Sequence, residues 1–451
     1  MRRPGAGFAL LPAGLLAGVG IAIRVHNAIR YPVDWGFDAS FSWRYIQQLI
    51  RDWSLPAPDS SWATADPPLY FYLCALIARG AEAAGDINAA KIAIPLLSTL
   101  AGLAVVALAV ALVRRSDAGD GRRALLAGGL LLFLPAHVYM SAMVNEEMLA
   151  VLLASIVLYA VARPRIAAGD PRAETARAAA AGLAGGLALL TKLTGALSLM
   201  TAGAAYALDG WRRGTLPAAV RRIAVLALVA TVAGGWYYAR NRIEYGYYQP
   251  HALPAHRVMF SMPPGERGLS DYLRVPLATW TNPQLLDPDL LRSVWGSTYA
   301  TVWFDGHRFF LPRDDDRVRR LGTLTLLLAL LPTLAFAIGL GRGLRRACRS
   351  PDGVDTPLLL MTGLTVAGYA FFTWRNPWFA VVKGTSLLAL SLPFAFYASE
   401  VLAGWTRGRT PAAVLCWLAL AALAVAATLS STFDLAFEKT EISGLLWESA
   451  E

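Results

Sequence analysis

Runs of about twenty apolar residues recur along most of the chain, separated by short polar loops. A helix of that length crosses the hydrocarbon part of a bilayer and satisfies its own backbone hydrogen bonds there. The runs are continuous blocks of Leu, Ala, Val and Gly, without the period-two alternation of a membrane β-barrel. Only 16% of the residues are charged, whereas a soluble domain carries about a quarter. We therefore expect an all-α polytopic membrane protein.

We expect about eleven membrane-spanning helices in this chain. They are placed at residues 8–30, 88–113, 124–140, 146–162, 178–191, 194–208, 222–239, 321–340, 356–373, 383–400 and 411–430. The first run is expected to be a retained helix rather than a cleaved signal peptide. Because no soluble domain is evident, residues 1–451 are interpreted as a single membrane-embedded domain.

The distribution of arginine predicts the orientation in the membrane. Short loops such as "RRSDAGDGRR" and "GRGLRRACRS" are rich in arginine and alternate with loops that are not. The positive-inside rule then places the N-terminus in the cytoplasm and two long loops, about 31–87 and 240–320, on the outer side. The net charge of +10 is explained by these loops and gives no reason to expect a nucleic-acid partner. The abundance of arginine and alanine is typical of a bacterial chain, and we expect the bacterial inner membrane.

The first outer loop carries two acids close to the membrane edge. Asp34 and Asp38 lie four residues apart in "YPVDWGFDASFSWRYI", directly after the first apolar run. If this stretch is helical, both carboxylates share one face, and one of them could act as a general base. The alternative is that Asp38 caps the helix that follows it. That helix, "SFSWRYIQQLIRDW", has apolar residues at helical spacing and is expected to lie on the membrane surface.

Further charged residues are expected at the same membrane edge. Glu146 and Glu147 begin an apolar run, where acids also favour a helix N-terminus, and Lys192 interrupts apolar sequence in "LLTKLTG". Cations in this region could bind a phosphate, or their side chains could extend to lipid headgroups. The substrate-binding candidates are Asp34, Glu147, Lys192, Arg240, Arg242, Arg375 and Lys383.

Several motifs in register resemble the GT-C superfamily of membrane glycosyltransferases, in the branch of the protein O-mannosyltransferases and the aminoarabinose transferase of lipid A. These motifs are "FDASFSWRYI", "DPPLYFYL", "FLPAHVYMSAMVNEEMLAVLLAS", "GLAGGLALLTKLTGALSL", "GGWYYARNRIEYG" and "VVKGTSLLALSLPFAFY". The resemblance implies a GT-C-like helix bundle with interfacial helices in the first outer loop. It also implies transfer of a sugar, with inversion, from a polyprenyl-phosphate donor to an acceptor hydroxyl on a glycan, lipid or protein.

The resemblance also implies roles for individual residues. Asp38 matches the catalytic acid of the family, Glu147 the acid of a later turn, and Lys192 and Lys383 two basic positions. The chain departs from the family pattern at Ala39, where a second acid is common, at Ser42, where a histidine is common, and at Asp66, where His or Gln is common.

Two questions stay open at the level of sequence. No cofactor is certain; if a divalent cation binds, Asp34, Asp38 and Glu147 are the expected ligands. The alternative functions are a transporter or lipid flippase and a non-catalytic scaffold of the cell envelope. A transporter often has repeated halves and broken helices near the middle of the membrane, whereas here the polar features gather at one side.

Overall fold

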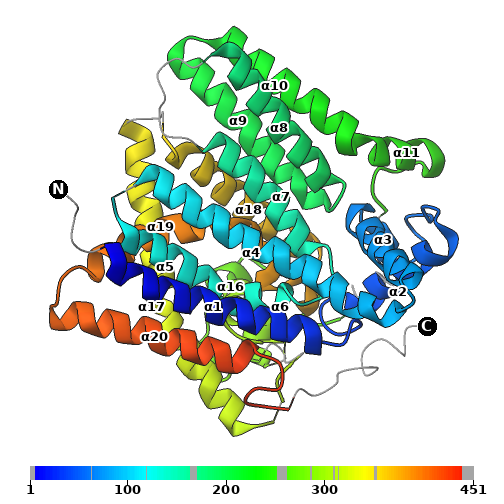
Figure 1. Cartoon of the computed structure of the whole chain (residues 1–451). Helices are drawn as coiled ribbons and strands as arrows, with labels where there is room; N and C mark the ends of the chain where they lie inside the picture. The colour runs from blue at the N-terminus through cyan, green and yellow to red at the C-terminus, as the bar shows by residue number, and fades with distance from the viewer. Residues whose placement is uncertain are drawn as a thin grey trace.

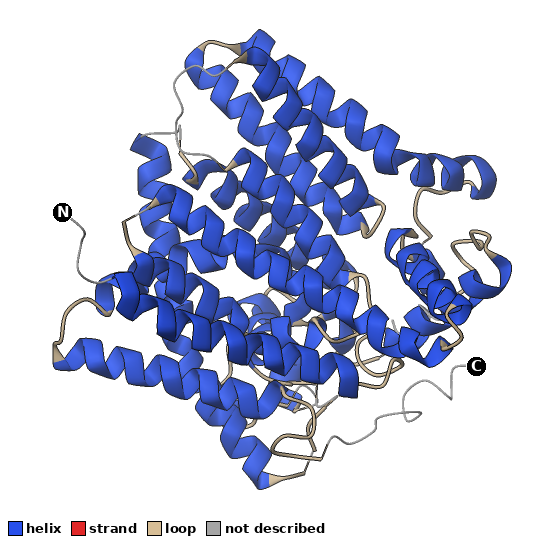
Figure 2. Cartoon of the chain, in the orientation of Figure 1, coloured by secondary structure: helices blue, strands red, loops and turns tan. Residues whose placement is uncertain are grey.

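The computed structural model describes residues 6–61, 63–117, 119–162, 170–250, 262–284, 287–307, 310–312, 314–349 and 353–438. The described residues form helices joined by loops and turns, and contain no strand (Figure 2). The α-helices are α1 (Ala6–Arg30), α2 (Ala39–Asp52), α3 (Leu69–Ala83), α4 (Ala90–Ser116), α5 (Gly121–Leu132), α6 (Pro135–Met140), α7 (Glu147–Val161), α8 (Pro171–Leu189), α9 (Ala196–Arg213), α10 (Leu216–Ala230), α11 (Trp236–Tyr245), α13 (Ser270–Leu273), α14 (Ala278–Thr281), α15 (Pro288–Arg292), α16 (Val294–Trp303), α17 (Asp316–Arg349), α18 (Asp355–Arg375), α19 (Ser391–Trp405) and α20 (Pro411–Ser431). Short 3-10 helices are η1 (Ala63–Ala65), η2 (Ile87–Ala89), η3 (Leu193–Gly195), η5 (Phe379–Val381) and η6 (Gly384–Leu390), and Thr231–Gly235 forms a π-helical turn between α10 and α11.

The expected all-α membrane architecture is confirmed. Every expected spanning segment is predominantly helical, and six helices in the described part of the chain are long and apolar enough to cross a membrane. The others are shorter or interrupted; for example, the segment expected at 124–140 is divided into α5 and α6. The expected number of crossings therefore stays a prediction.

The helices gather into two packed groups. One contains α1, α4, α5, α17, α19 and α20, and the other contains α8, α9 and α10, which join the first group through α7 and α18 (Figure 1). Helices α2 and α3 lie together at one end of the bundle, near α11 (Figure 1). We call this the α2–α3 end, and the opposite end, where α4 ends and α5 begins, the arginine-rich end.

Helices α8 and α10 pack with their backbones in close contact. The α-carbon of Gly186 faces the carbonyl oxygen of Ala230, and Gly234 in the π-helical turn faces the backbone of Gly186. A Cβ atom on Gly186 would lie 2.6 Å from that carbonyl oxygen, which is too close for any side chain. Small residues of this kind allow membrane helices to approach closely and gain dispersion contacts. The glycines of "GLAGGLALL" are thus explained by packing.

An arginine inside the bundle stabilises the break between α5 and α6. Arg24 of α1 is fully buried and donates hydrogen bonds to the carbonyl oxygens of Leu131 and Leu132 at 3.0 and 2.8 Å. It also contacts Nδ1 of His137, 3.1 Å away. The last carbonyls of a helix have no partner within the helix, so a buried donor supplies the missing hydrogen bonds. The sequence analysis did not identify this residue.

The first outer loop folds as two helices, α2 and α3. The buried face of α2 includes Tyr45, Ile46 and Leu49, which pack in one cluster with Phe71 and Cys74 of α3. The apolar face of α2 is therefore covered by α3, and the expected position of α2 on the membrane surface stays a prediction. The long second loop contributes α16 to the core, where Tyr139 of α6 donates a hydrogen bond of 2.6 Å to the carbonyl oxygen of Thr301.

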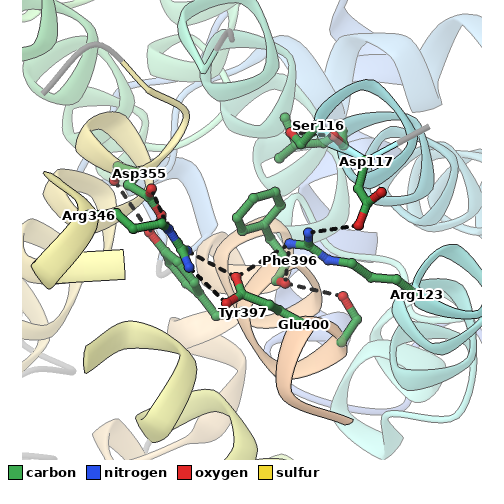
Figure 3. Close-up of polar contacts among 10 residues, drawn as sticks. Ser116, Asp117, Arg123, Arg346, Asp355, Phe396, Tyr397 and Glu400 are labelled. Carbon is green, nitrogen blue, oxygen red and sulfur yellow. Dashed lines mark hydrogen bonds and ion pairs between the residues drawn. The ribbon is translucent and has the colours of Figure 1, made fainter. Parts of the chain in front are cut away.

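At the arginine-rich end, arginines form a network that joins several helices (Figure 3). Arg346 of α17 contacts Asp355 of α18 at 2.9 Å and Glu400 of α19 at 2.8 Å. Arg123 of α5 lies 3.7 Å from Glu400 and 3.9 Å from Asp117, at the end of α4. These arginines therefore hold helix ends together in addition to any role in orientation.

Candidate functional site

Asp38 occupies a left-handed turn immediately before α2. Its φ of 58° and ψ of 9° place it in a region that Asp tolerates better than most residues, although at some conformational cost. Its side chain does not cap α2; one carboxylate oxygen, Oδ2, instead lies 3.2 Å from Nζ of Lys383. The helix-cap alternative is therefore wrong for this carboxylate.

Lys383 is held in place by the second long loop and by the aromatic residue before Asp38. The backbone N–H of Gly384 donates a hydrogen bond of 2.7 Å to the hydroxyl of Thr301 in α16. The Lys383 ammonium also lies 5.1 Å from the centre of the Phe37 ring, a cation–π geometry. An acid and a base 345 residues apart in the chain thus meet at the α2–α3 end of the bundle.

A second charged group lies at the start of α7. Nζ of Lys192 is 2.6 Å from carboxylate oxygens of both Glu146 and Glu147, and both glutamates are buried. Glu147 is the first residue of α7, so the helix dipole and the lysine both stabilise its charge. The predicted acid and the predicted base of this region therefore contact one another directly.

Asp66 lies within the electrostatic range of both charged groups. Burial is the largest effect on its carboxyl and raises the pKa well above its usual value, and the negative charges of Glu146, Asp38 and Glu147 raise the pKa further. The charge of Lys192 acts in the opposite direction. Hydrogen bonds fix the surrounding loop: Leu69 N–H donates to the carbonyl oxygen of Leu190 at 2.9 Å.

The second long loop brings a buried guanidinium toward Lys383. Arg267 is 6% exposed and donates from Nη1 to the carbonyl oxygen of Arg292 at 3.1 Å, but its Nε and Nη2 have no hydrogen-bond partner among the described residues. Both the Arg267 charge and the backbone of Lys383 act on the Tyr369 hydroxyl. Arg267 thus has two buried donors without a hydrogen-bond partner among the described residues, on the same side of the protein as Tyr369.

His307 contacts Phe37, the aromatic residue that also contacts Lys383. The centroids of the His307 and Phe37 rings lie 5.2 Å apart. Burial lowers the pKa of His307 to about 3, and the charge of Lys383 acts in the same direction. The imidazole is therefore neutral at physiological pH and adds no positive charge to the site.

In the described part of the chain, the remaining predicted residues make no hydrogen bond or ion pair with the two lysines of these groups. Asp34 is exposed in a turn, outside any helix, so the prediction that it shares a helical face with Asp38 is wrong. Arg240 pairs with Glu244 at 2.9 Å, and Arg242 is exposed and donates to the carbonyl oxygen of Gly246. Arg375 is exposed at the end of α18. Their predicted role in substrate binding stays a prediction.

The profile of a family described as dolichyl-phosphate-mannose-protein mannosyltransferase matches residues 65–238. No curated protein matches this sequence. Among solved structures, ArnT from Cupriavidus metallidurans bound to undecaprenyl phosphate is similar, with a TM-score of 0.53 and 16% identity over 95% of this chain and 76% of that one. The oligosaccharyltransferase AglB from Archaeoglobus fulgidus, in complex with an inhibitory peptide and a dolichol-phosphate, gives a TM-score of 0.54 and 17% identity over 94% of this chain.

The chain has the GT-C fold. The resemblance to the GT-C superfamily is thereby confirmed. The chain spans 56% of the length of the archaeal oligosaccharyltransferase. The family profile includes Asp66, Glu146, Glu147 and Lys192, whereas Asp38 and Lys383 lie outside the matched range.

The expected ligands of a divalent cation do not come together in this GT-C bundle. Asp34 is exposed, and Glu147 forms an ion pair with Lys192. Among the residues that the structure describes, no three His, Cys, Asp or Glu side chains are placed to hold a metal ion. The site as described is therefore built from carboxylates paired with lysines.

The sequence analysis did not propose Asp66 or Arg267 as residues of the candidate site. Asp66 was noted only as a departure from the family pattern, although an acid directly before "PPL" at the end of a loop is itself a signal. Arg267 lies in the Pro-rich stretch "SMPPGERGLSDYL", where nothing in the pattern separates it from a surface arginine. Its burial depends on how the second long loop folds over α16 and α18.

Proposed function

We propose that the chain is an inverting glycosyltransferase that moves a sugar from a polyprenyl-phosphate donor to an acceptor hydroxyl. The observation that carries the proposal is the Asp38–Lys383 pair at the α2–α3 end of a GT-C bundle. The contact with Lys383 and the left-handed turn hold this carboxylate in one orientation, as a general base requires. The α2–α3 end then faces the outer side of the bacterial inner membrane, with the N-terminus in the cytoplasm.

The proposed reaction is a single displacement at the anomeric carbon of the sugar. Asp38 takes the proton of the acceptor hydroxyl as its oxygen attacks that carbon. The bond between the carbon and the phosphate oxygen breaks, and its electron pair leaves with the polyprenyl phosphate. Attack on the face opposite the leaving group inverts the configuration of the sugar.

The leaving phosphate requires positive charge as its own negative charge grows. Lys383 lies beside the proposed base. Arg267 supplies a second buried cation, whose Nε and Nη2 have no hydrogen-bond partner among the described residues. Donors in a buried site are already oriented and interact more strongly than in water. We assign these two cations to the donor phosphate, and Glu147 with Lys192 to the hydroxyls of the sugar.

Sugar transfer by the full-length protein in lipid nanodiscs tests the proposal. A labelled undecaprenyl-phosphate sugar is offered together with an envelope fraction from a strain that lacks the gene, and new glycosidic bonds are measured. We expect Asp38→Asn to lower the rate by about 10²–10⁴-fold, the range for loss of a general base. Asp52→Asn is the matched control, because Asp52 is an exposed acid at the end of α2, the helix that follows Asp38. We expect this variant to keep wild-type activity.

Two outcomes contradict the proposal. Full activity of Asp38→Asn at equal expression removes the residue from the role of base. If the protein in lipid vesicles moves the labelled lipid from one leaflet to the other without forming a new glycosidic bond, the alternative of a transporter or flippase is favoured.

A further inference from the structure

The second long loop exposes an apolar face next to the end of a spanning helix. Leu269, Leu273 and Leu277 are 69, 76 and 72% exposed, and they recur every four residues through α13 and the turn that follows it. A soluble surface rarely exposes several large apolar side chains side by side. In contrast, the apolar face of α2 in the first loop is covered by α3.

This apolar face continues the lipid-facing surface of α18. Phe371, Phe372 and Trp374 are exposed at the end of that spanning helix, where aromatic residues mark the membrane–water interface. Tyr272 joins the two surfaces: its ring lies 5.9 Å from that of Trp374, and its hydroxyl contacts the hydroxyl of Thr373 at 2.9 Å. Leu273 of α13, the neighbour of Tyr272, therefore lies close to the aromatic end of α18.

The opposite face of the same segment is held by polar contacts. Asp271 is buried, accepts a hydrogen bond from Gly268 N–H at 3.1 Å and lies 3.7 Å from Arg292. Arg274 pairs with Asp289 at 2.7 Å. The segment thus has one polar face, which is fixed to the protein, and one apolar face, which no described residue covers. This is the pattern of an element that lies in a membrane interface.

We propose that residues 268–278 insert the leucine face of the second long loop into the lipid leaflet at the α2–α3 end. The occupant of this surface is the acyl region of membrane lipids, since the surface continues that of a spanning helix. Arg267 directly precedes the segment, so insertion holds its guanidinium near the plane of the lipid phosphates. This second part rests on the proposed function, in which Arg267 binds the donor phosphate.

Fluorescence quenching from the bilayer measures the insertion. The exposed Cys348 is first replaced by Ser. This Cys348→Ser parent, treated with the same label, gives the background fluorescence from the buried Cys74 and Cys416. Leu273→Cys or Leu277→Cys then carries an environment-sensitive NBD label. The control is Asp289→Cys, an exposed position on the polar side of the same loop. The labelled proteins are placed in phosphatidylcholine–phosphatidylglycerol nanodiscs with a nitroxide on the upper acyl chain.

We expect the labels at positions 273 and 277 to lose about half or more of their fluorescence to the nitroxide, as an interfacial side chain at acyl depth should. The label at position 289 should be unaffected. Equal quenching at positions 273, 277 and 289 overturns the proposal. A single elution peak and an unchanged melting temperature show that each labelled protein is folded.

A second pair of variants separates the insertion from the proposed function. We expect Arg267→Met to raise the donor concentration needed for half-maximal sugar transfer by about tenfold or more, the loss of a charge-assisted hydrogen bond. Arg274→Met, an exposed arginine in the same loop, should change it little. If positions 273 and 277 are quenched but Arg267→Met transfers sugar normally, the insertion stands and the role of Arg267 is refuted.

Discussion

At the scale of the residue, Asp66 is placed where a charged carboxylate is disfavoured. Burial and the neighbouring acids Glu146, Asp38 and Glu147 raise the pKa of Asp66 in the folded protein. Between the usual pKa of an aspartate and this raised value, the folded state binds a proton that the unfolded state has released. The free energy of unfolding therefore falls as pH rises through this window, by up to about 1.4 kcal/mol per pH unit.

We predict that Asp66→Asn removes this fall in the free energy of unfolding with rising pH. The melting temperature of the wild type should fall more steeply between weakly acidic and alkaline pH than that of the variant, because an amide cannot ionise. Thermal unfolding in nanodiscs across that range measures the two slopes. Asp52→Asn, whose carboxylate is exposed, should retain the wild-type slope. Parallel slopes for Asp66→Asn and the wild type would show that Asp66 is ionised throughout.

Lys192 combines a structural and a proposed catalytic role, and these can be separated. Lys192→Met leaves two buried carboxylates without a partner, so we expect a loss of about 3–5 kcal/mol in the free energy of unfolding. Adding Glu146→Gln and Glu147→Gln removes those charges and should restore most of the stability. Sugar transfer should not return in the triple variant. Restored transfer would mean that the three residues serve packing alone.

At the scale of the element, helix spacing in this bundle depends on individual glycines. Gly186 meets the backbone of α10, which cannot move away as a flexible side chain could. By contrast, nothing lies within 4 Å of a Cβ placed on Gly363 of α18. Both glycines lie in helices, so a change in helix propensity is common to both positions and only the packing differs.

We predict that Gly186→Val destabilises the protein, by about 1–3 kcal/mol or more, because it forces α8 and α10 apart. Gly363→Val should have no comparable effect. Thermal unfolding and the yield of monodisperse protein compare the two variants. A melting temperature for Gly186→Val equal to that of Gly363→Val would contradict the close packing of α8 and α10.

At the scale of the whole molecule, the two ends of the bundle use charge differently. At the arginine-rich end, Glu400 joins Arg346 and Arg123, and so ties α19 to α17 and α5 (Figure 3). At the α2–α3 end, lysines meet carboxylates that are proposed to contact substrate. Variants at the first end should therefore change stability without changing the activity per folded molecule, whereas variants at the second end should change that activity as well.

Glu400→Gln tests this division. We expect it to lower the free energy of unfolding by about 1.5–3 kcal/mol, since Arg346 and Arg123 both lose a charged partner. The activity per folded molecule should stay at the wild-type level, because Glu400 lies at the opposite end of the bundle. Asp316→Asn, in an exposed pair with Arg319, should cost much less. Loss of sugar transfer without loss of stability would refute the division.

The sequence by itself determined the fold class and the approximate position of the long helices, because long apolar runs in a bilayer have no alternative to helical hydrogen bonding. It also proposed Asp38, Glu147, Lys192 and Lys383 as site candidates, but not that they form two pairs. Those pairs, the cover that α3 gives to α2, the partial burial of Asp66 and the burial of Arg267 were decided by the tertiary structure. The reason is physical: apolar periodicity is a local property, whereas ion pairs between distant residues, burial and pKa depend on which helix ends and loops meet in space.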